Sequence, residues 1–299
     1  MARYIVTGGA GFIGSNIVDL LIDEGHNVHV LDNFSTGERS YLNPKAELTE
    51  FDLVVDSGLE RHLKGGDGIF HVAALPRIQP SYTDPIGHDD ANVRATLKVA
   101  QAMIAAGVKR CVFSGSSAVY GTPVDLPTPE TAQIQPLSPY ALQKYTAEHY
   151  LMTLGERFGL LIGGLRYFNV YGPRSFNPRN QFNAYSSVIG IFGAAVRAGQ
   201  RPKVTGTGEQ RRDFVHVRDV AQANYLAMTR LDASSVLNVG TGKAYTINAI
   251  AEMFAPSWDF IPERPGEAAI TLADTRRIAR LLGWAPKAEV EAAIRAGDI

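Results

Sequence analysis

Two tyrosines in the sequence are each followed four residues later by a lysine, a spacing that can support acid–base chemistry. A phenol with a pKa near 10 is a poor base at neutral pH unless a cation lies beside it. At about 4 Å and an effective dielectric constant of about 20, the lysine charge contributes roughly 4 kcal/mol. Because about 1.4 kcal/mol moves a pKa by one unit, such a lysine lowers the tyrosine pKa by around three units.

Only one of these two pairs is expected to work together. Pro44 interrupts the pair Tyr41 and Lys45, whereas a Ser-Pro step predicts a helix start just before Tyr140. On a helix, Tyr140 and Lys144 share one face because they are one turn apart. We therefore predict Tyr140 as the general base and Lys144 as the cation that activates it.

A glycine-rich segment, YIVTGGAGFIGSNIVDLL, places Gly8, Gly11 and Gly14 after a predicted strand and at the start of a predicted helix. Glycine allows a tight turn and a close approach of the backbone to a pyrophosphate at the helix N-terminus. About 20 residues downstream, the next strand ends at Asp32 and Asn33, where a carboxylate can accept hydrogen bonds from a ribose. A carboxylate repels a phosphorylated ribose, so the segment predicts NAD rather than NADP.

Two further patterns do not indicate a site. The segment NVGTGKAYT differs from a P-loop, which requires glycine in place of Leu237 and a hydroxyl side chain in place of Ala244. The seven histidines show no metal-ligand spacing with carboxylates or thiols. We therefore predict neither a P-loop nor a metal site.

The hydrophobic pattern predicts parallel strands joined by helices, the arrangement of an α/β doubly wound sheet. Strands are expected near Tyr4–Thr7, Val28–Leu31, Leu48–Asp52, Gly68–Val72, Arg110–Ser114 and Leu160–Leu165. Helices are expected over Gly11–Glu24, Asn92–Ala106 and Pro139–Phe158. The regular alternation ends after Asn169, which predicts a cofactor-binding Rossmann domain at 1–165, rejoined by about 214–239. A smaller α/β substrate domain is expected from 166–213 and 240–299.

Composition restricts the partners. With 29 basic and 30 acidic residues, no overall charge favours nucleic acid or an anionic membrane. The longest apolar stretch, Val188 to Val196, is too short to span a bilayer. One cysteine, Cys111, excludes an internal disulfide and favours a reducing compartment. Together with the lack of a signal-peptide pattern, this predicts a cytoplasmic protein with small-molecule partners.

The chain resembles the extended short-chain dehydrogenase family in five motifs that occur in the same order. They are TGGAGFIGS, FSGSSAVYG, SPYALQK, RYFNVYGPR and RRDFVHVRDV. The similarity spans nearly the whole chain and is greatest to UDP-hexose 4-epimerases. It implies a Rossmann-type sheet with a smaller C-terminal lobe, bound NAD, and inversion of carbon 4 of a UDP-sugar through a 4-keto sugar. It also implies that Ser116 completes a triad with Tyr140 and Lys144, with Ser117 as the alternative one position later.

The resemblance further implies contacts to both ligands. Cofactor contacts are expected from Gly8, Gly11, Phe12, Ile13, Gly14, Asp32, Asn33, Asp52, Leu53, Ala73, Ala74, Asn92, Lys144 and Tyr167. Substrate contacts are expected from Ser116, Tyr140, Asn169, Val188, Val204, Arg212, Arg264 and Thr271. Arginine suits the diphosphate because its planar fork binds phosphate oxygens in pairs, and Arg211 is the alternative to Arg212. Thr271 stands where a residue gates the sugar pocket, and its modest size admits an N-acetyl group.

Other functions remain open at this stage. A uronate epimerase, a dehydratase, a net reductase or a noncatalytic NAD-binding sensor could share the fold. The triad argues against a sensor, and Ser117 and Ala118 stand where dehydrating or decarboxylating relatives usually carry an acid. The resemblance also implies a homodimer in which the helices expected at Asn92–Ala106 and Pro139–Phe158 form a four-helix bundle.

Overall fold

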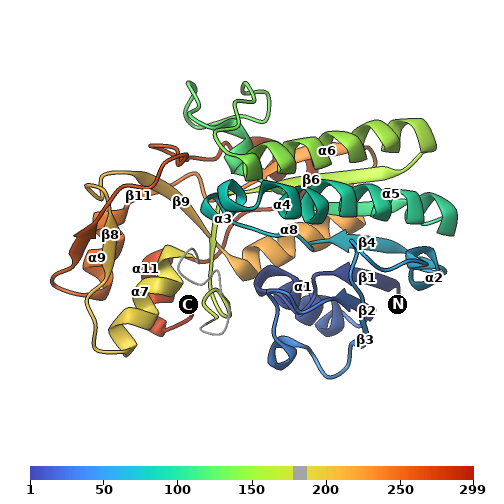
Figure 1. Cartoon of the computed structure of the whole chain (residues 1–299), viewed down its shortest axis with the longest axis horizontal. Helices are drawn as coiled ribbons and strands as arrows, with labels where there is room; N and C mark the ends of the chain where they lie inside the picture. The colour runs from blue at the N-terminus through green and yellow to red at the C-terminus, as the bar shows by residue number, and fades with distance from the viewer. Residues whose placement is uncertain (178–186) are drawn as a thin grey trace.

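The largest element of the computed structural model, which describes residues 1–177 and 187–299, is a parallel seven-stranded sheet (Figure 1). Its strands, in spatial order, are β3 (Glu47–Glu50), β2 (Asn27–Asp32), β1 (Arg3–Thr7), β4 (Gly68–His71), β5 (Arg110–Ser116), β6 (Leu161–Tyr167) and β10 (Ser235–Val239). The chain order reverses between β1 and β4, where doubly wound sheets bind nucleotides. The predicted fold class is confirmed, and each expected strand of this sheet lies within two residues of its expected bounds.

Helices cover both faces of this sheet because its strands are apolar on both sides. One face carries α1 (Phe12–Asp23) and α8 (Val217–Arg230), whose inward side chains join one apolar core with the sheet. The other face carries α2 (Leu59–Leu63), α5 (Ala95–Ala106) and α6 (Pro139–Phe158), which enclose a second core. Figure 1 shows α5 and α6 side by side on that face. The sheet is therefore buried on both sides and provides a rigid base for the loops at its edge.

Helix α6 shows how local sequence sets an element's bounds. The Ser138 hydroxyl accepts a hydrogen bond from the Ala141 amide at 3.2 Å, and Pro139 occupies the first helical position. Gly159 ends the helix with a left-handed φ of 64°. The predicted helix Pro139–Phe158 is confirmed at both ends, so Tyr140 lies in its first turn. Among the residues that the structure describes, no helix is long and apolar enough to cross a membrane.

A smaller lobe is built on two short sheets. Its strands are β7 (Asn169–Tyr171), β9 (Arg211–His216) and β11 (Ala244–Thr246) in one sheet, with β8 (Lys203–Thr205) and β12 (Asp259–Ile261) in the other. Its helices are α7 (Val188–Arg197), α9 (Ile247–Phe254) and α11 (Val290–Ala296). Their apolar side chains form a third core around Phe192, Phe214 and Ile250. We call this unit the smaller lobe.

The chain passes between the two units several times. After β9 it forms α8 and then β10, which returns to the large sheet beside β6. Helix α10 (Arg276–Leu282) packs against α8 and β10, although it follows most of the smaller lobe in sequence. The remaining elements are α3 (Ile78–Thr83), α4 (Pro85–Asp89), a π-helical turn (Asp90–Arg94) that precedes α5, and 3-10 turns at Arg39–Tyr41 and Ser117–Tyr120.

Candidate active site

A cavity of about 580 Å³ lies between the edge of the large sheet and the smaller lobe, a volume typical of small-molecule sites. The sequence-predicted site residues that line it are Phe12, Ile13, Ser116, Tyr140, Tyr167, Asn169, Val188, Arg212, Arg264 and Thr271. The predicted residues outside this lining are Gly8, Gly11, Gly14, Asp32, Asn33, Asp52, Leu53, Ala73, Ala74, Asn92, Lys144 and Val204. Most residues expected to contact the sugar nucleotide therefore face one space.

The glycine turn after β1 packs closely against neighbouring backbone. Gly8 has a φ of 72°, and a Cβ added there would lie 2.6 Å from the Ala73 amide nitrogen. A Cβ added at Gly14 would lie 2.1 Å from the Gly8 carbonyl oxygen. Helix α1 begins after Gly11 with no side-chain cap and no acidic residue in its first turn. Its free amides and dipole therefore fit an anion such as a pyrophosphate.

Asp32 stands at the end of β2 beside this turn. One carboxylate oxygen accepts a hydrogen bond from the Ala10 amide at 2.8 Å, and the other accepts one from the Phe34 amide at 2.8 Å. Burial raises the pKa of Asp32, although these two amides counteract that effect. A carboxylate has about four acceptor positions, so it can also accept hydrogen bonds from ribose hydroxyls. Asp32 thus both holds the turn and fits a nucleoside.

Three other residues expected at the cofactor lie near the ends of β2 and β3. The Asn33 side chain donates to the Asp52 carboxylate at 2.9 Å, which brings these two residues together. Leu53 is buried in the core formed with α2 and α5, so its side chain packs inside the protein. Asn33 and Asp52 therefore form a polar pair, while Leu53 has a packing role in this structure.

The loop after β4 is held by the buried side-chain amide of Asn92. Ala73 and Ala74 are half-buried, and the Ala73 amide donates to the Thr7 carbonyl at 3.0 Å. Asn92 accepts a hydrogen bond from the Leu75 amide at 2.9 Å and donates to the Leu75 carbonyl at 3.1 Å. The Asn92 side chain was expected near the cofactor, and its polar atoms hold the loop that borders the glycine turn.

Tyr167, at the end of β6, lines the cavity with its hydroxyl already engaged. Its hydroxyl lies 3.0 Å from the Ser114 hydroxyl and donates to Asn224 at 2.9 Å. Burial raises the pKa of Tyr167 to about 12, so the phenol stays neutral. Tyr167 therefore contributes a fixed aromatic wall to the cavity.

Tyr140 and Ser116 form the reactive pair of this site. Both line the cavity, and the Tyr140 phenol is hydrogen-bonded to Ser116. Ser117 also lines the cavity, but the partner of Tyr140 is Ser116. Burial raises the pKa of Tyr140, whereas the Ser116 hydrogen bond and the positive charge of Arg77 lower it in part. The net pKa lies above the ordinary value, contrary to the expected three-unit decrease, because burial outweighs both effects.

Lys144 lies one turn further along α6 and is buried beneath the cavity wall. Its ammonium group sits 4.4 Å from the centre of the Phe113 ring on β5, a cation–π contact. Burial lowers the pKa of Lys144 to about 7, although the Glu148 carboxylate raises it. The neighbouring His71 has a pKa lowered to about 3, first by burial and then by Lys144. In the structure, the charge of Arg77 lowers the pKa of Tyr140 in part, and the Lys144 ammonium lies over Phe113 and acts electrostatically on His71. The activating role of Lys144 stays a prediction.

A buried ion pair limits the influence of Glu148 on Lys144. The Arg166 guanidinium donates to both carboxylate oxygens of Glu148, at 2.6 and 3.0 Å. Arg166 also donates to the Tyr120 hydroxyl at 2.9 Å, and this hydroxyl donates to Asn238 at 2.6 Å. Because Arg166 neutralises Glu148, the carboxylate only partly offsets the desolvation of Lys144.

Burial of Lys144 predicts a rise of stability with pH. Between its folded pKa of about 7 and an unfolded pKa of about 10.4, Lys144 is neutral when folded and charged when unfolded. The unfolded state then binds the extra proton, so the free energy of unfolding increases by about 1.4 kcal/mol per pH unit. Relative to Lys144→Met, the nucleotide-free wild type is expected to gain roughly 2 kcal/mol between about pH 7.5 and pH 9.

Urea unfolding at these two pH values measures the effect of Lys144. The matched control is Lys64→Met, because Lys64 is exposed and its ammonium group stays in water in both states. A difference between wild type and Lys144→Met that does not change with pH contradicts the assigned burial.

Arg212 places a guanidinium on the cavity wall formed by the smaller lobe. It is buried on β9, and its guanidinium pairs with Glu267 at 3.3 Å and donates to the Ala269 carbonyl at 3.3 Å. Burial lowers the pKa of Arg212, and the charge of Glu267 opposes this effect. The Arg211 side chain is exposed and donates to the Ala244 carbonyl, outside the cavity lining. Of the two neighbouring arginines, only Arg212 lines the cavity.

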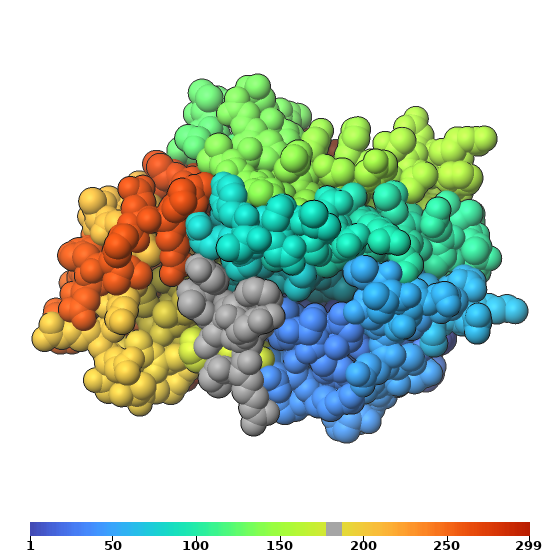
Figure 2. Space-filling model, in the orientation of Figure 1, coloured from blue at the N-terminus to red at the C-terminus, as the bar shows by residue number. Residues whose placement is uncertain are grey.

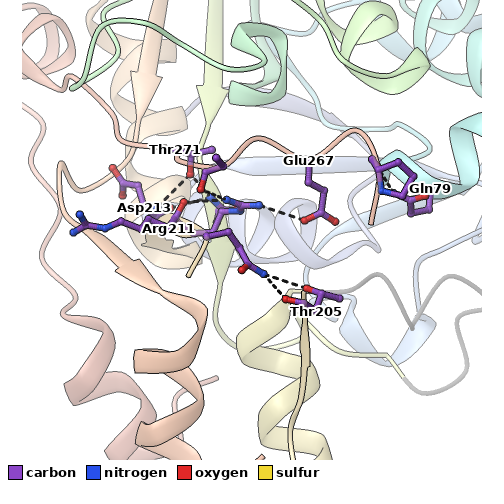
Figure 3. A network of polar contacts seen from close by, with 11 residues as sticks. Gln79, Thr205, Arg211, Asp213, Glu267 and Thr271 are labelled. Atoms are coloured by element: carbon purple, nitrogen blue, oxygen red, sulfur yellow. Dashed lines mark hydrogen bonds and ion pairs between the residues drawn. The ribbon is translucent and has the colours of Figure 1, made fainter. Parts of the chain in front are cut away.

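A polar network connects Arg212 to both units. Figure 3 shows Asp213 and Thr271 on one side of Glu267 and Gln79 on the other. The Gln79 amide donates to the Pro265 carbonyl at 2.8 Å, which ties α3 to the segment after β12. Figure 2 shows this segment, in orange, against the teal segment that holds α3 and α4. The loop that carries Glu267 is thus anchored to α3, which follows β4 of the large sheet.

Asn169 and Thr271 meet where the two lobes join. Asn169 donates to the Thr271 hydroxyl at 3.0 Å and to the Asp213 carbonyl at 3.3 Å. Asp213 is buried and accepts hydrogen bonds from the Thr241 and Gly242 amides at 2.7 and 2.9 Å. The second glycine cluster of the sequence therefore turns around a carboxylate, which fixes the strand that carries Arg212.

The remaining expected substrate contacts differ in their placement. Val188 is the first residue of α7. Both Val188 and Arg264 line the cavity. Val204 is fully buried in the core of the smaller lobe, and its strand neighbours Lys203 and Thr205 line the cavity instead. Since side chains alternate along a strand, the Val204 side chain must point away from the cavity.

With this geometry in place, similarity to known proteins decides the family. The model of the NAD dependent epimerase/dehydratase family matches residues 4–240. The chain belongs to this family. A UDP-glucose 4-epimerase from Mycolicibacterium smegmatis is 35% identical over 298 residues, covering 95% of this chain and 94% of the relative. The resemblance inferred from the five motifs is thereby confirmed.

Two solved epimerase structures are similar along the whole chain. UDP-glucose 4-epimerase from Thermotoga maritima, solved with UDP-glucose, has a TM-score of 0.92 and 35% identity, covering 98% of this chain and 96% of that one. UDP-N-acetylglucosamine 4-epimerase from Methanobrevibacter ruminantium, in complex with UDP-N-acetylmuramic acid, has a TM-score of 0.91 and 37% identity with the same coverages. The uncapped start of α1 after the glycine turn and the carboxylate of Asp32 fit the NAD on which this family depends.

The sequence analysis did not single out three polar residues of this epimerase-family site. Arg77 and Glu267 line the cavity, and Asp213, which follows Arg212 in β9, accepts a hydrogen bond from the Ala273 amide at 3.0 Å. A signal for Arg77 existed, because it closely follows the loop expected to border the cofactor. In residues 1–177 and 187–299, no three His, Cys, Asp or Glu side chains group as metal ligands.

Proposed function

We propose that this chain is an NAD-dependent UDP-hexose 4-epimerase. The observation that carries this proposal is the hydrogen-bonded pair of Ser116 and Tyr140 on the wall of a cavity that also reaches α1 and Arg212. The cavity thus joins a nucleotide-binding turn, an acid–base group and an anion-binding arginine in one space. These are the three functions that C4 epimerisation of a nucleotide sugar requires.

The chain's own residues supply binding and proton transfer. The amides at the start of α1 would hold the pyrophosphate of NAD, and Asp32 would bind its adenosine ribose. Bound NAD supplies the hydride acceptor and donor for carbon 4. Tyr140 takes the proton of the 4-hydroxyl and later returns it, while Ser116 hydrogen-bonds the same oxygen. Lys144, buried beside them, adds positive charge when protonated.

Inversion requires that the ketone present its opposite face before hydride returns. Arg212 and Arg264 would hold the diphosphate while the hexose rotates, which is a positional role. For this, the diphosphate must replace Glu267 at the Arg212 guanidinium, since the two now pair at 3.3 Å. Asn169 and Thr271 border the sugar, and the modest size of Thr271 leaves room for an N-acetyl group.

Incubation of the purified protein with UDP-galactose and no added NAD tests the function. We expect UDP-glucose to form until equilibrium is reached, with no net change in absorbance at 340 nm, because the cofactor is regenerated in each cycle. UDP-N-acetylgalactosamine in a parallel reaction tests the wider pocket. Net accumulation of reduced nucleotide would instead indicate a dehydrogenase, and an inert protein would indicate a noncatalytic NAD-binding role.

We also propose a homodimer formed through α5 and α6 as a four-helix bundle. Apolar side chains that support this proposal are exposed around α4 and α6, including Ile86 at 76%, Leu142 at 54% and Tyr150 at 45%. Sedimentation at micromolar concentration is expected to give a dimer, and Leu142→Glu to give a monomer because it places charges in the interface. Sedimentation of the wild type only as a monomer contradicts the proposed dimer.

The division into domains stays a proposal as well. Residues 1–165 and 214–239 are proposed to bind NAD, and residues 166–213 and 240–299 to bind the nucleotide sugar. Limited proteolysis with and without ligands tests these bounds. We propose a cytoplasmic location, supported by the single buried thiol of Cys111, and small-molecule partners rather than nucleic acid or membrane.

A further inference from the structure

The charges on the cavity wall are unbalanced. Among its described lining residues, the positively charged side chains are Arg77, Lys203, Arg212 and Arg264. The same lining holds a single carboxylate, Glu267, and this group pairs with Arg212. A diphosphate accounts for Arg212 and Arg264 in the proposed function. Arg77 lies toward Tyr140, because it immediately precedes α3, whose Ser81 hydroxyl accepts a hydrogen bond from the Tyr140 amide at 3.1 Å, and both Arg77 and Tyr140 line the cavity.

Arg77 is held in this position by a rigid loop. Its backbone has a φ of 96° and a ψ of 135°, a conformation that residues other than glycine rarely adopt. Such strain costs about 1–3 kcal/mol and persists only where the surroundings impose it. The surroundings here include Asn92, which bonds both backbone groups of Leu75, and Gln79, which bonds the segment after β12. The loop therefore presents Arg77 to the cavity at a fixed place.

The guanidinium of Arg77 is not engaged by the protein that surrounds it. No residue of 1–177 or 187–299 forms a hydrogen bond or ion pair with its side chain. Burial lowers the pKa of Arg77, and Tyr140 opposes this effect. A partly desolvated guanidinium with open donors is costly to leave unpaired, and its planar fork matches a carboxylate. Its location thus fits an anionic group of the ligand.

The position of Tyr140 defines which group that is. Tyr140 acts on the 4-hydroxyl of the hexose, and the carbon next to C4 in the ring is C5. In a hexuronic acid, C5 carries a carboxylate directly bonded to the ring. A carboxylate there would lie beside Tyr140 and would repel a phenolate unless a cation stood between them. Arg77 is the lining cation whose charge already reaches Tyr140.

We propose that Arg77 binds the C5 carboxylate of the hexose, so that the preferred substrates of this site are UDP-hexuronic acids. This inference rests on the proposed 4-epimerase function and specifies its substrate class. Arg77 acts as a specificity residue, since it contacts the substrate away from the reacting carbon. Neutral UDP-hexoses remain substrates, but they leave the guanidinium without its anion.

The test compares UDP-glucuronate with UDP-glucose as substrates of four proteins: wild type, Arg77→Gln, Arg77→Gly and Lys203→Gln. The wild type is expected to show a kcat/KM at least ~10-fold higher for UDP-glucuronate. Arg77→Gln is expected to lower kcat/KM for both sugars, because both lose the charge that acts on Tyr140, but about 10-fold more for UDP-glucuronate, because only the uronate also loses a charge partner. Lys203→Gln removes the same charge from the same cavity and should keep the wild-type ratio.

Arg77→Gly separates recognition from folding. Glycine accepts the backbone angles of this position, so we expect this variant to melt no lower than the wild type, yet to lose the uronate preference. Equal losses on both substrates in Arg77→Gln and Arg77→Gly would overturn the proposal, as would a wild-type preference for UDP-glucose. The same selective loss in Lys203→Gln would also overturn it, because recognition would then depend on overall charge.

Binding measurements distinguish this proposal from the proposed function. Isothermal titration of wild type and Arg77→Gln with UDP-glucuronate and UDP-glucose reports recognition without turnover. If the wild type turns over neither sugar, the 4-epimerase function fails. A selective loss of UDP-glucuronate affinity in Arg77→Gln still supports the role of Arg77 in that case, and unchanged affinities for both sugars contradict it.

Discussion

Tyr140→Phe is expected to lower kcat for UDP-galactose epimerisation by about 10³-fold, within the range by which a positioned acid–base group accelerates a reaction. The substitution removes a single hydroxyl, the one that Ser116 hydrogen-bonds at the cavity wall. Without it, the cavity wall loses the group proposed to take the proton from the 4-hydroxyl. Substrate binding and melting temperature should change little, because the ring that lines the cavity remains.

The product ratio after incubation with UDP-galactose measures this effect. Tyr41→Phe is the matched control, since it alters the other Tyr-x-x-x-Lys pattern and should keep wild-type kcat. Melting curves and the amount of copurified NAD show whether each variant is folded. Full activity in Tyr140→Phe would show that another group is the base. Loss of activity in Tyr41→Phe would show that the catalytic tyrosine belongs to the other pattern.

Gly14→Ala is expected to deplete the purified protein of NAD and to lower the free energy of unfolding by about 3 kcal/mol. The added methyl group would lie 2.1 Å from the Gly8 carbonyl oxygen and 2.9 Å from the Gly9 Cα. These atoms are backbone, so no flexible side chain can move aside. The glycine turn must shift, and the amides that fit the pyrophosphate shift with it.

The absorbance of the nucleotide released on denaturation measures the NAD content of Gly14→Ala. Urea unfolding measures its free energy of unfolding. Asp23→Ala provides the control, because it adds an alanine at an exposed position of the same helix, α1. We expect it to retain wild-type NAD content. If Gly14→Ala also retains full NAD content, the close packing of Gly14 against Gly8 does not determine cofactor binding.

The raised pKa of Tyr140 determines when this phenol can act as a base. In the structure, burial raises this pKa despite Ser116 and Arg77, so the phenol is neutral at pH 7 without ligands. Further positive charge is needed to ionise it, and Lys144, with a pKa of about 7, is only partly charged there. A bound cationic nicotinamide would favour the phenolate by proximity. The base is therefore expected to become active only when the cofactor is present.

Local features of this protein could be predicted from its sequence. Strand residues that are apolar on both sides, the glycine turn, and the caps of α6 depend on neighbours a few residues apart, so their bounds could be predicted from spacing. The i and i+4 placement of Tyr140 and Lys144 follows from helix geometry alone. The five motifs added the family, which the comparisons confirmed.

The way in which distant segments meet depends on tertiary packing. Arg77 and Tyr140 come together across 63 positions because β4 ends and α6 begins at the same edge of the sheet, and Glu267 reaches Arg212 from a loop after β12. The sequence could not show that Val204 faces the core while Lys203 and Thr205 face the cavity, because that depends on which side of β8 is covered. It also could not give the pKa of Tyr140. Desolvation depends on all the atoms packed around a group, and most of those atoms are remote in sequence.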